Sequence, residues 1–212
     1  MLYYMDHLDH LLQEGMDSFE SFLSCERYAK AMKYRYQIDQ LQCILVYVLL
    51  RYALVVEHDY LGFPSFQRGE GGKPILTELP QVYFNVAHCK TGVACVLDTD
   101  PVGVDIQNYV PYDEELVPYF MSEEEKKVAR TRQSSFFFTR TWALKESYGK
   151  WLGVGILYDM AGYTAIQGKG NGYFNSSFMM PNYVLATTTR DPQFPQRVTL
   201  MDIKRCLSSQ FI

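Results

Sequence analysis

Two residues suited to acid–base and phosphate chemistry, Glu146 and Lys150, stand four positions apart in the segment WALKESYGK at residues 142–150. Four residues in a helix return to nearly the same face with a rise of about 6 Å, so both side chains share one column with Trp142. The same spacing also describes an ordinary solvated pair, which contributes only roughly 0.2–0.5 kcal/mol. A catalytic role therefore depends on what the rest of the chain supplies.

A carboxylate inside a strand-like segment, VGVDIQ at residues 102–107, gives a second indication of chemistry. Period-two alternation puts Gly103, Asp105 and Gln107 on one face. Aspartate is depleted in strand interiors, so Asp105 either meets solvent on an exposed face or binds a ligand. In the second interpretation Gly103 leaves room for the ligand, and Asp105, Gln107 and Glu146 offer oxygen atoms to a hard cation such as Mg²⁺.

Four basic side chains could complete a phosphate site beside such a metal: Arg27, Lys30, Lys73 and His88. Each also has an ordinary interpretation. Lys73 lies in a glycine turn, His88 ends a predicted strand, and the other two fit the wet face of a helix. Their joint occurrence favours a metal-assisted phosphate site.

The composition limits the other possibilities. The chain has 212 residues, 48% of them hydrophobic, and a formal net charge of −4, which fits a globular protein and argues against nucleic-acid binding. Its five cysteines lack zinc-site spacing and favour reduced thiols in the cytoplasm. The N-terminus lacks the pattern of a secretory signal. The apolar residues 41–56 contain Arg51 and are too short to cross a bilayer, which predicts a buried helix and no membrane association.

The expected elements alternate helices with groups of strands. We expect helices over 18–57, 122–132 and 136–152, and strands over 82–88, 91–98, 101–107 and 183–187. Ser122 and Glu125 have capping-box spacing, and the short connections favour antiparallel neighbours among the three central strands. The order of helix, glycine-bearing turn and strand occurs roughly twice, which suggests two related halves.

Four motifs together resemble a known family: GGKP at 71–74, FNVAH at 84–88, VGVDIQ at 102–107 and WALKESYGK at 142–150. They are similar in order and spacing to those of the 4′-phosphopantetheinyl transferases, in particular the larger, pseudo-dimeric kind that activates surfactin synthetase. The resemblance implies an α+β fold of two similar α/β subdomains forming a pseudo-dimer, residues 1–102 and 103–212, with the active site in the cleft between them. It also implies a monomer.

The reaction implied by the resemblance is transfer of the 4′-phosphopantetheine arm of coenzyme A to a serine hydroxyl of an apo acyl or peptidyl carrier protein. The by-product is adenosine 3′,5′-bisphosphate, and the cofactor is Mg²⁺, with Mn²⁺ as an alternative. By position, the catalytic residues are Asp105, Glu146 and Lys150, the metal ligands are Asp105, Gln107 and Glu146, and the coenzyme A contacts are Arg27, Lys30, Lys73, His88 and Lys150.

Some residues depart from the family pattern. Gln107 stands where many members have a carboxylate, and Ala87 and Cys89 replace the serines beside the histidine. Loss of one negative charge should weaken metal binding. Two alternatives therefore stay open: a degenerate member that binds coenzyme A or a carrier protein without catalysis, and a metal-dependent phosphohydrolase.

Overall fold

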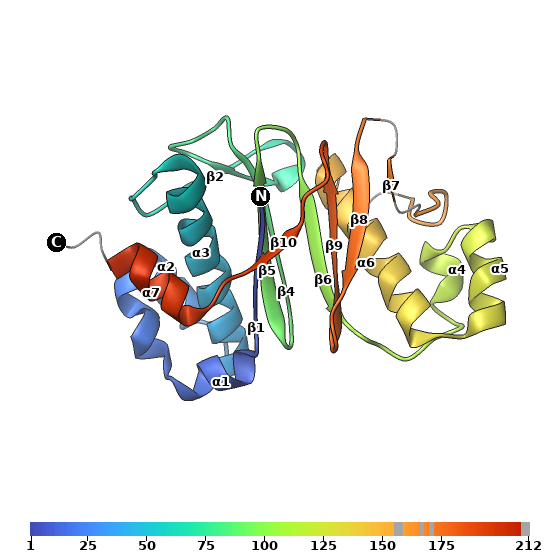
Figure 1. Ribbon diagram of the computed structural model, residues 1–212, viewed down its shortest axis with the longest axis horizontal. Helices are drawn as coiled ribbons and strands as arrows, with labels where there is room; N and C mark the ends of the chain where they lie inside the picture. The colour runs from blue at the N-terminus through green and yellow to red at the C-terminus, as the bar shows by residue number, and fades with distance from the viewer. Residues whose placement is uncertain (155–158, 166–167, 170–171, 209–212) are drawn as a thin grey trace.

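The protein is an α+β chain built around two four-stranded sheets (Figure 1). The computed structural model describes residues 1–154, 159–165, 168–169 and 172–208. Sheet 1 has the order β10 (Pro195–Arg197), β1 (Leu2–Asp6), β5 (Gly92–Asp98), β4 (Tyr83–Cys89). Sheet 2 has the order β6 (Gly103–Asn108), β9 (Tyr183–Thr189), β8 (Phe174–Met179), β7 (Gly168–Lys169). A separate hairpin consists of β2 (Phe66–Arg68) and β3 (Pro74–Leu76).

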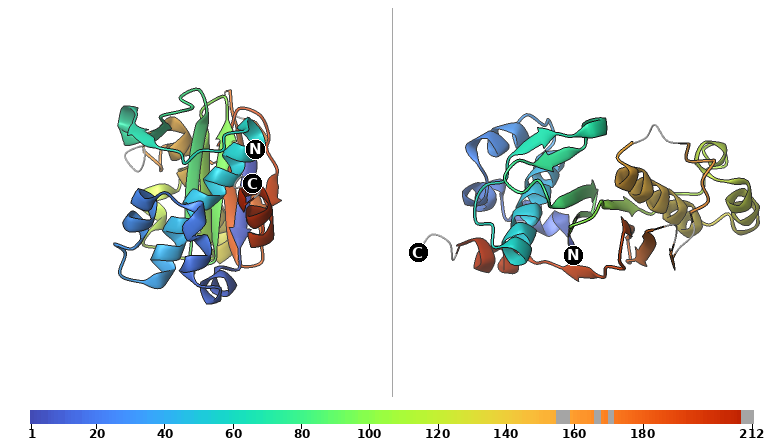
Figure 2. Two further views of the ribbon diagram at one scale, coloured as in Figure 1. Left: turned by 90° about the vertical axis from the view of Figure 1, so that its left-hand side faces the viewer. Right: turned by 90° about the horizontal axis from the view of Figure 1, so that it is seen from above.

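Helices lie on the outer sides of both sheets (Figures 1 and 2). The first half contains α1 (Leu8–Gln13), η1 (Met16–Phe22), α2 (Cys25–Ala31), α3 (Gln37–His58) and η2 (Glu70–Gly72). The second half contains α4 (Val117–Phe120), α5 (Glu123–Arg132) and α6 (Ser135–Leu152), and α7 (Leu200–Ser208) ends the described chain. Val93 and Cys95 of sheet 1 pack in the cluster that contains α3, while Ala143 and Leu144 of α6 pack on sheet 2. The order of layers is therefore α3, sheet 1, sheet 2, α6.

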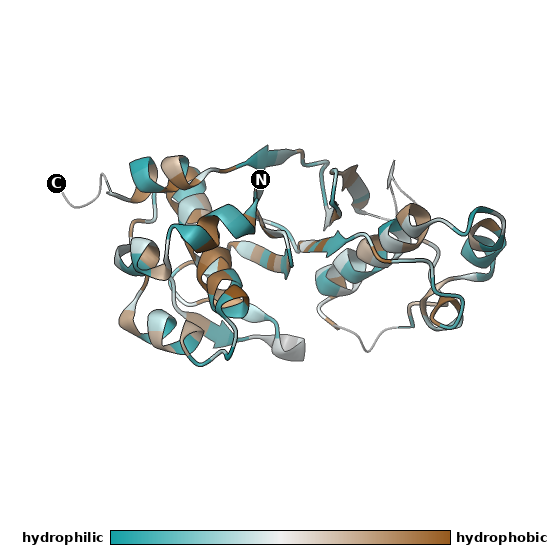
Figure 3. Ribbon diagram, turned by 90° about the horizontal axis from the view of Figure 1, so that it is seen from below, coloured by the Kyte–Doolittle hydropathy of each residue, from teal (hydrophilic) through white to brown (hydrophobic). Residues whose placement is uncertain are grey.

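Helix α3 forms the centre of the larger core. By length and hydropathy it could cross a membrane, but 67% of its most apolar stretch of 18 residues is buried inside the molecule. Leu41, Leu45 and Leu49 are fully buried on it, and Figure 3 shows hydrophobic residues concentrated there. Burial of this apolar surface against sheet 1 stabilises the helix in place. The prediction of a buried core helix is confirmed.

The three central strands do not form one antiparallel meander, so that expectation was wrong for the third. β4 and β5 pair antiparallel as predicted, but β6 leaves sheet 1 and pairs with β9 in sheet 2. Val104 and Ile106 of β6 pack between the sheets with Ala94 and Val96 of β5. β6 therefore packs against β5 across an apolar layer instead of forming backbone hydrogen bonds with it.

The end of the chain returns to the first half. β10 pairs parallel with β1, and Ile203 and Leu207 of α7 are buried in the core that contains α3. Sheet pairing thus places residues 195–208 with sheet 1, which differs from the expected assignment of everything after residue 102 to one C-terminal subdomain. An amphipathic segment at the end of a chain gives no sequence signal for which half it covers.

Helix α5 begins and helix α6 ends at residues typical of helix caps. In α5 the Ser122 side chain accepts from Glu125 N and the Glu125 carboxylate accepts from Ser122 N, so the capping box is confirmed. Helix α6 ends at Leu152, and the next residue, Gly153, caps it with a φ of 78°, a left-handed conformation that favours glycine. Trp142 is partly buried and packs against Phe120, at 5.2 Å between ring centroids.

Gly103 lets α6 approach β6 and does not provide the ligand clearance expected from the sequence. A Cβ atom at this position would lie 1.9 Å from Ser147 O and 2.6 Å from Trp151 N. We expect Gly103→Ala to lower the free energy of unfolding by about 1–3 kcal/mol, because helix and strand must move apart. Urea unfolding measures the loss. The clash is with main-chain atoms, so adding Ser147→Gly should not restore stability; full recovery in that double variant would contradict this explanation.

Candidate active site

Asp105 and Lys150 meet where β6 and α6 are held together. Lys150 Nζ lies 2.8 Å from Asp105 Oδ1 and donates to Val104 O at 3.0 Å. Alternation along β6 turns Val104 and Ile106 toward sheet 1 and Asp105 toward α6, as the sequence predicted. The close contact at Gly103 sets the register in which the lysine reaches the carboxylate.

The second oxygen of the Asp105 carboxylate, Oδ2, has no partner among the described residues. Asp105 is 8% exposed, and its Oδ2 atom is buried with no hydrogen-bond partner among the described residues. Buried polar atoms are rarely left without a partner in folded proteins. An unsatisfied carboxylate oxygen beside a second acid is therefore suited to receive a cation or a donor carried by a ligand.

Glu146 lies one helical turn before Lys150 and shares the electrostatic environment of Asp105. Burial raises the pKa of Glu146, the charge of Asp105 raises it further, and Lys150 opposes the shift. A carboxyl group whose pKa is raised by burial and a like charge is better matched to accepting a proton near neutral pH. The structure thus brings together the three residues expected to be catalytic.

His88 approaches this group from sheet 1. β4 and β6 are adjacent, and Asn85 Oδ1 of β4 accepts from Val104 N of β6 at 3.1 Å. His88 is exposed on β4, but partial desolvation by its neighbours and the charge of Lys150 lower its pKa, while Asp39 and Asp105 oppose this shift. The contact between β4 and β6 therefore brings His88, which lines the basic cavity described next, toward the strand that carries Asp105.

Arg27 and Lys30 line a cavity of about 220 Å³ together with His88. Arg27 Nη2 donates to Cys43 O at 3.3 Å, and its guanidinium lies 5.0 Å from the centroid of the Tyr47 ring. Three basic side chains around one small cavity favour an anionic ligand. Asp39 also lines it, a neighbour that we had not anticipated.

Lys73 is placed differently from the other basic residues. Its Nζ donates to Val102 O and to Lys150 O, each at 2.8 Å, and so bridges the glycine turn to the end of α6. Burial lowers the pKa of Lys73 to about 8. The expected contact with a phosphate of coenzyme A stays a prediction, whereas the bridge between the two halves is a structural fact.

The predicted metal ligands comprise two carboxylates and one amide. Within the described ranges, no cluster of three or more His, Cys, Asp or Glu side chains could hold a metal ion. Gln107 lies on the same face of β6 as Asp105 and could add an amide oxygen to the two carboxylates. The free Oδ2 of Asp105 and the raised pKa of Glu146 fit a bound divalent cation, which would neutralise both acids.

A buried ion pair behind the site was missed from the sequence. Lys145 Nζ lies 2.7 Å from Glu125 Oε2, with side chains 0% and 6% exposed. The ammonium group also donates to Met160 O at 2.6 Å and to Tyr163 O. Glu125 Oε1 accepts from Ala165 N at 2.6 Å. The capping box identified Glu125, but no pattern in the sequence distinguishes a buried Lys145 from a solvated one.

Fold and site together define an α+β protein that sets a carboxylate pair and a lysine beside a small basic cavity. The model of the 4′-phosphopantetheinyl transferase superfamily matches residues 101–184. The chain is 28% identical to 4′-phosphopantetheinyl transferase Sfp of Bacillus subtilis (strain 168), over 96% of this chain and 97% of that protein. It is 27% identical to 4′-phosphopantetheinyl transferase psf-1 of Bacillus pumilus, over 94% and 93%. These matches support the identification of the chain as a 4′-phosphopantetheinyl transferase, which is an enzyme.

Proposed function

We propose that this enzyme transfers the 4′-phosphopantetheine arm of coenzyme A to a serine hydroxyl of an apo acyl or peptidyl carrier protein. The observation that supports this most strongly is the joining of Asp105, Glu146 and Lys150 to a basic cavity at His88. Arg27, Lys30 and His88 would hold the phosphates of the adenosine end.

The reaction needs a proton acceptor and charge neutralisation. Glu146 would take the serine proton as the oxygen attacks phosphorus. Lys150 would exchange Asp105 Oδ1 for a phosphate oxygen and stabilise the charge that builds up on the leaving group. The new Ser Oγ–P bond forms while the P–O bond within the diphosphate breaks, and adenosine 3′,5′-bisphosphate leaves.

Asp105, Glu146 and Gln107 would hold the divalent cation, Mg²⁺ or Mn²⁺. When bound, the cation neutralises phosphate charge and polarises phosphorus for attack. Asp105 would then have both carboxylate oxygens occupied, with the lysine or a ligand at Oδ1 and the cation at Oδ2.

Gln107→Glu should strengthen metal binding. The substitution restores a third carboxylate, so we expect the Mg²⁺ concentration for half-maximal activity to fall by at least about tenfold. Measuring transfer against Mg²⁺ concentration checks this, with Gln67→Glu on the exposed hairpin as the matched control. An unchanged Mg²⁺ dependence in Gln107→Glu would remove this residue from the ligand set.

The architecture supports three further parts of the proposal. The two four-stranded sheets, each covered by a long helix, support a pseudo-dimer divided near residue 102, except that β10 and α7 return to the first half; the active site would lie between the halves. Because residues of both halves meet at the site, the chain would work as a monomer. The five cysteines are free, which is consistent with a cytoplasmic protein.

The direct test is the intact mass of a panel of apo carrier proteins incubated with the enzyme, coenzyme A and Mg²⁺. Gain of one phosphopantetheine arm, lost without metal and in Asp105→Ala, supports the transferase. Binding of coenzyme A without loading of any carrier would support the degenerate binding module instead. Release of phosphate from coenzyme A without a carrier would support the phosphohydrolase.

A further inference from the structure

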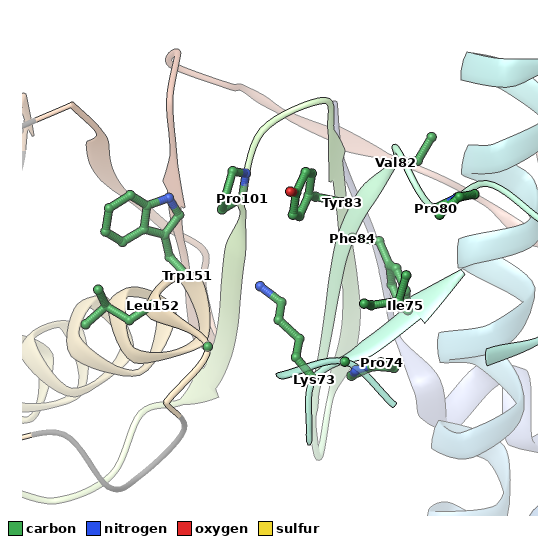
Figure 4. A pocket seen from close by; sticks show the side chains of 12 residues that line it. Lys73, Pro74, Ile75, Pro80, Val82, Tyr83, Phe84, Pro101, Trp151 and Leu152 are labelled. Atoms are coloured by element: carbon green, nitrogen blue, oxygen red, sulfur yellow. The ribbon is translucent and has the colours of Figure 1, made fainter. Parts of the chain in front are cut away.

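The glycine turn of the first half contacts the last turn of α6 in the second half. Lys73 Nζ donates to Lys150 O and to Val102 O, each at 2.8 Å. A Cβ atom on Gly71 would lie 2.3 Å from Gly153 O. Figure 4 looks into the neighbouring cavity and shows the Lys73 side chain extending between the two halves. The turn therefore holds the end of α6 at the main chain of Lys150 and again at Gly153.

Two lysines span the same seam between α6 and β6. Lys150 crosses it from α6, with its Nζ atom on Val104 O and Asp105 Oδ1. Lys73 closes it from the first half by joining Lys150 O to Val102 O, two residues before Val104. Lys73 thus fixes the main chain of the lysine whose side chain reaches the carboxylate.

The partners of Lys73 suit an ammonium group that caps a helix. Lys150 O is among the last carbonyl groups of α6, where the helix dipole is negative and a cation is favourable. Within the described ranges no carboxylate pairs with Lys73. Gly69 N donates to Lys73 O at 2.8 Å and closes the turn behind it. The lysine therefore acts on the main chain of α6 and on the start of β6.

On the basis of the proposed function, we propose that Lys73 and Gly71 are positioning residues for Lys150. They hold the last turn of α6 against the first half, so the lysine that stabilises the leaving group keeps its place relative to the basic cavity at His88. A displacement of about 1 Å at a catalytic group can cost roughly 100-fold in rate. Lys73 then acts on kcat through Lys150, and not through a phosphate contact of its own.

A double-mutant cycle on carrier loading separates these two roles of Lys73. We expect Lys73→Met to lower kcat by about 10- to 100-fold and to change KM for coenzyme A by less than about threefold. In a Lys150→Ala background the same substitution should lower kcat by less than about twofold, because the group that it positions is absent. Arg68→Met, which removes an exposed cation from the same hairpin, is the control and should keep both constants. A higher KM in both backgrounds, with kcat kept, would show a direct phosphate contact and overturn the proposal.

Gly71 tests the contact with α6 without a change in charge. Gly71 has a φ of 66° and Gly72 a φ of 80°, so alanine meets similar backbone strain at both positions. Only Gly71→Ala also clashes with Gly153 O, since a Cβ atom on Gly72 has no atom within 4 Å. We expect Gly71→Ala to lower kcat as Lys73→Met does, and Gly72→Ala to change it by less than about twofold. Equal losses in the two glycine variants would contradict the positioning role of Gly71.

Trp151 follows Lys150 and reports on the last turn of α6 without turnover. The chain has two tryptophans, so Trp142→Phe leaves Trp151 as the single fluorophore. In that background we expect Lys73→Met, but not Arg68→Met, to make Trp151 emission about twofold more easily quenched by acrylamide. Lys73→Arg, which keeps the donors, should restore the protection, and unchanged quenching in Lys73→Met would overturn the proposal. Loading of no carrier by the unaltered enzyme would refute the proposed function instead, and the quenching would still decide how α6 is held.

Discussion

Glu146→Gln is expected to lower the rate of carrier loading by about 10²- to 10⁴-fold, the range for loss of a general base. The amide keeps the size of the side chain but cannot accept the serine proton. Single-turnover loading, followed by intact mass at saturating coenzyme A, measures the loss. Thermal unfolding of the same variant should show an unchanged or higher midpoint, because a carboxyl group held near Asp105 is removed.

The pH profile gives an independent check on the same residue. Burial and Asp105 raise the pKa of Glu146 in the metal-free protein, so at low Mg²⁺ concentration the wild-type rate should begin to fall on acidification at a higher pH than for an ordinary glutamate. Glu146→Asp, which keeps the carboxylate, should recover part of the rate. Full activity in Glu146→Gln would show that another group accepts the proton.

Lys145→Met is expected to lower the free energy of unfolding by about 3–5 kcal/mol, because it leaves Glu125 buried without its cation. Burial lowers the pKa of Lys145 and the Glu125 carboxylate opposes the shift, so both charges depend on the pairing. Equilibrium unfolding in urea measures the loss. Lys127→Met on the exposed side of α5 is the control and should change stability by less than about 0.5 kcal/mol.

A double variant distinguishes the pair from simple loss of packing. Lys145→Met with Glu125→Gln removes both charges, and the single amide oxygen can still accept from one of the two N–H groups, Ser122 N or Ala165 N, that the carboxylate accepts from. We expect this variant to be more stable than Lys145→Met alone. If both variants lose the same stability, the ionic interaction does not account for the effect.

Local signals in the sequence were enough for α5, α6, the three central strands and the central acids, whereas the helix expected over 18–57 is divided into η1, α2 and α3. The capping box fixed the start of α5, alternation placed Asp105 on the face opposite Val104 and Ile106, and helical spacing put Glu146 and Lys150 in one column. Each of these depends on neighbours within a few residues. Their joint presence was what predicted a metal-assisted phosphate site.

Features that depend on distant contacts could not be obtained in the same way. The periodicity of residues 103–108 is that of any half-buried strand, so it did not reveal that β6 begins a second sheet. The role of Gly103 depends on Ser147 and Trp151, and that of Lys73 on the carbonyls of Val102 and Lys150. A glycine or lysine has the same local signature whichever partner it meets.

The return of β10 and α7 to the first half has a consequence for synthesis on the ribosome. β1 is among the first segments to emerge, but β10, its parallel neighbour, is made almost last. Until then one edge of β1 has no strand beside it, and the surface of α3 that receives Ile203 and Leu207 stays uncovered. The nascent N-terminal half must therefore wait for nearly the whole chain, and exposed edges and apolar surface of this kind are what chaperones recognise.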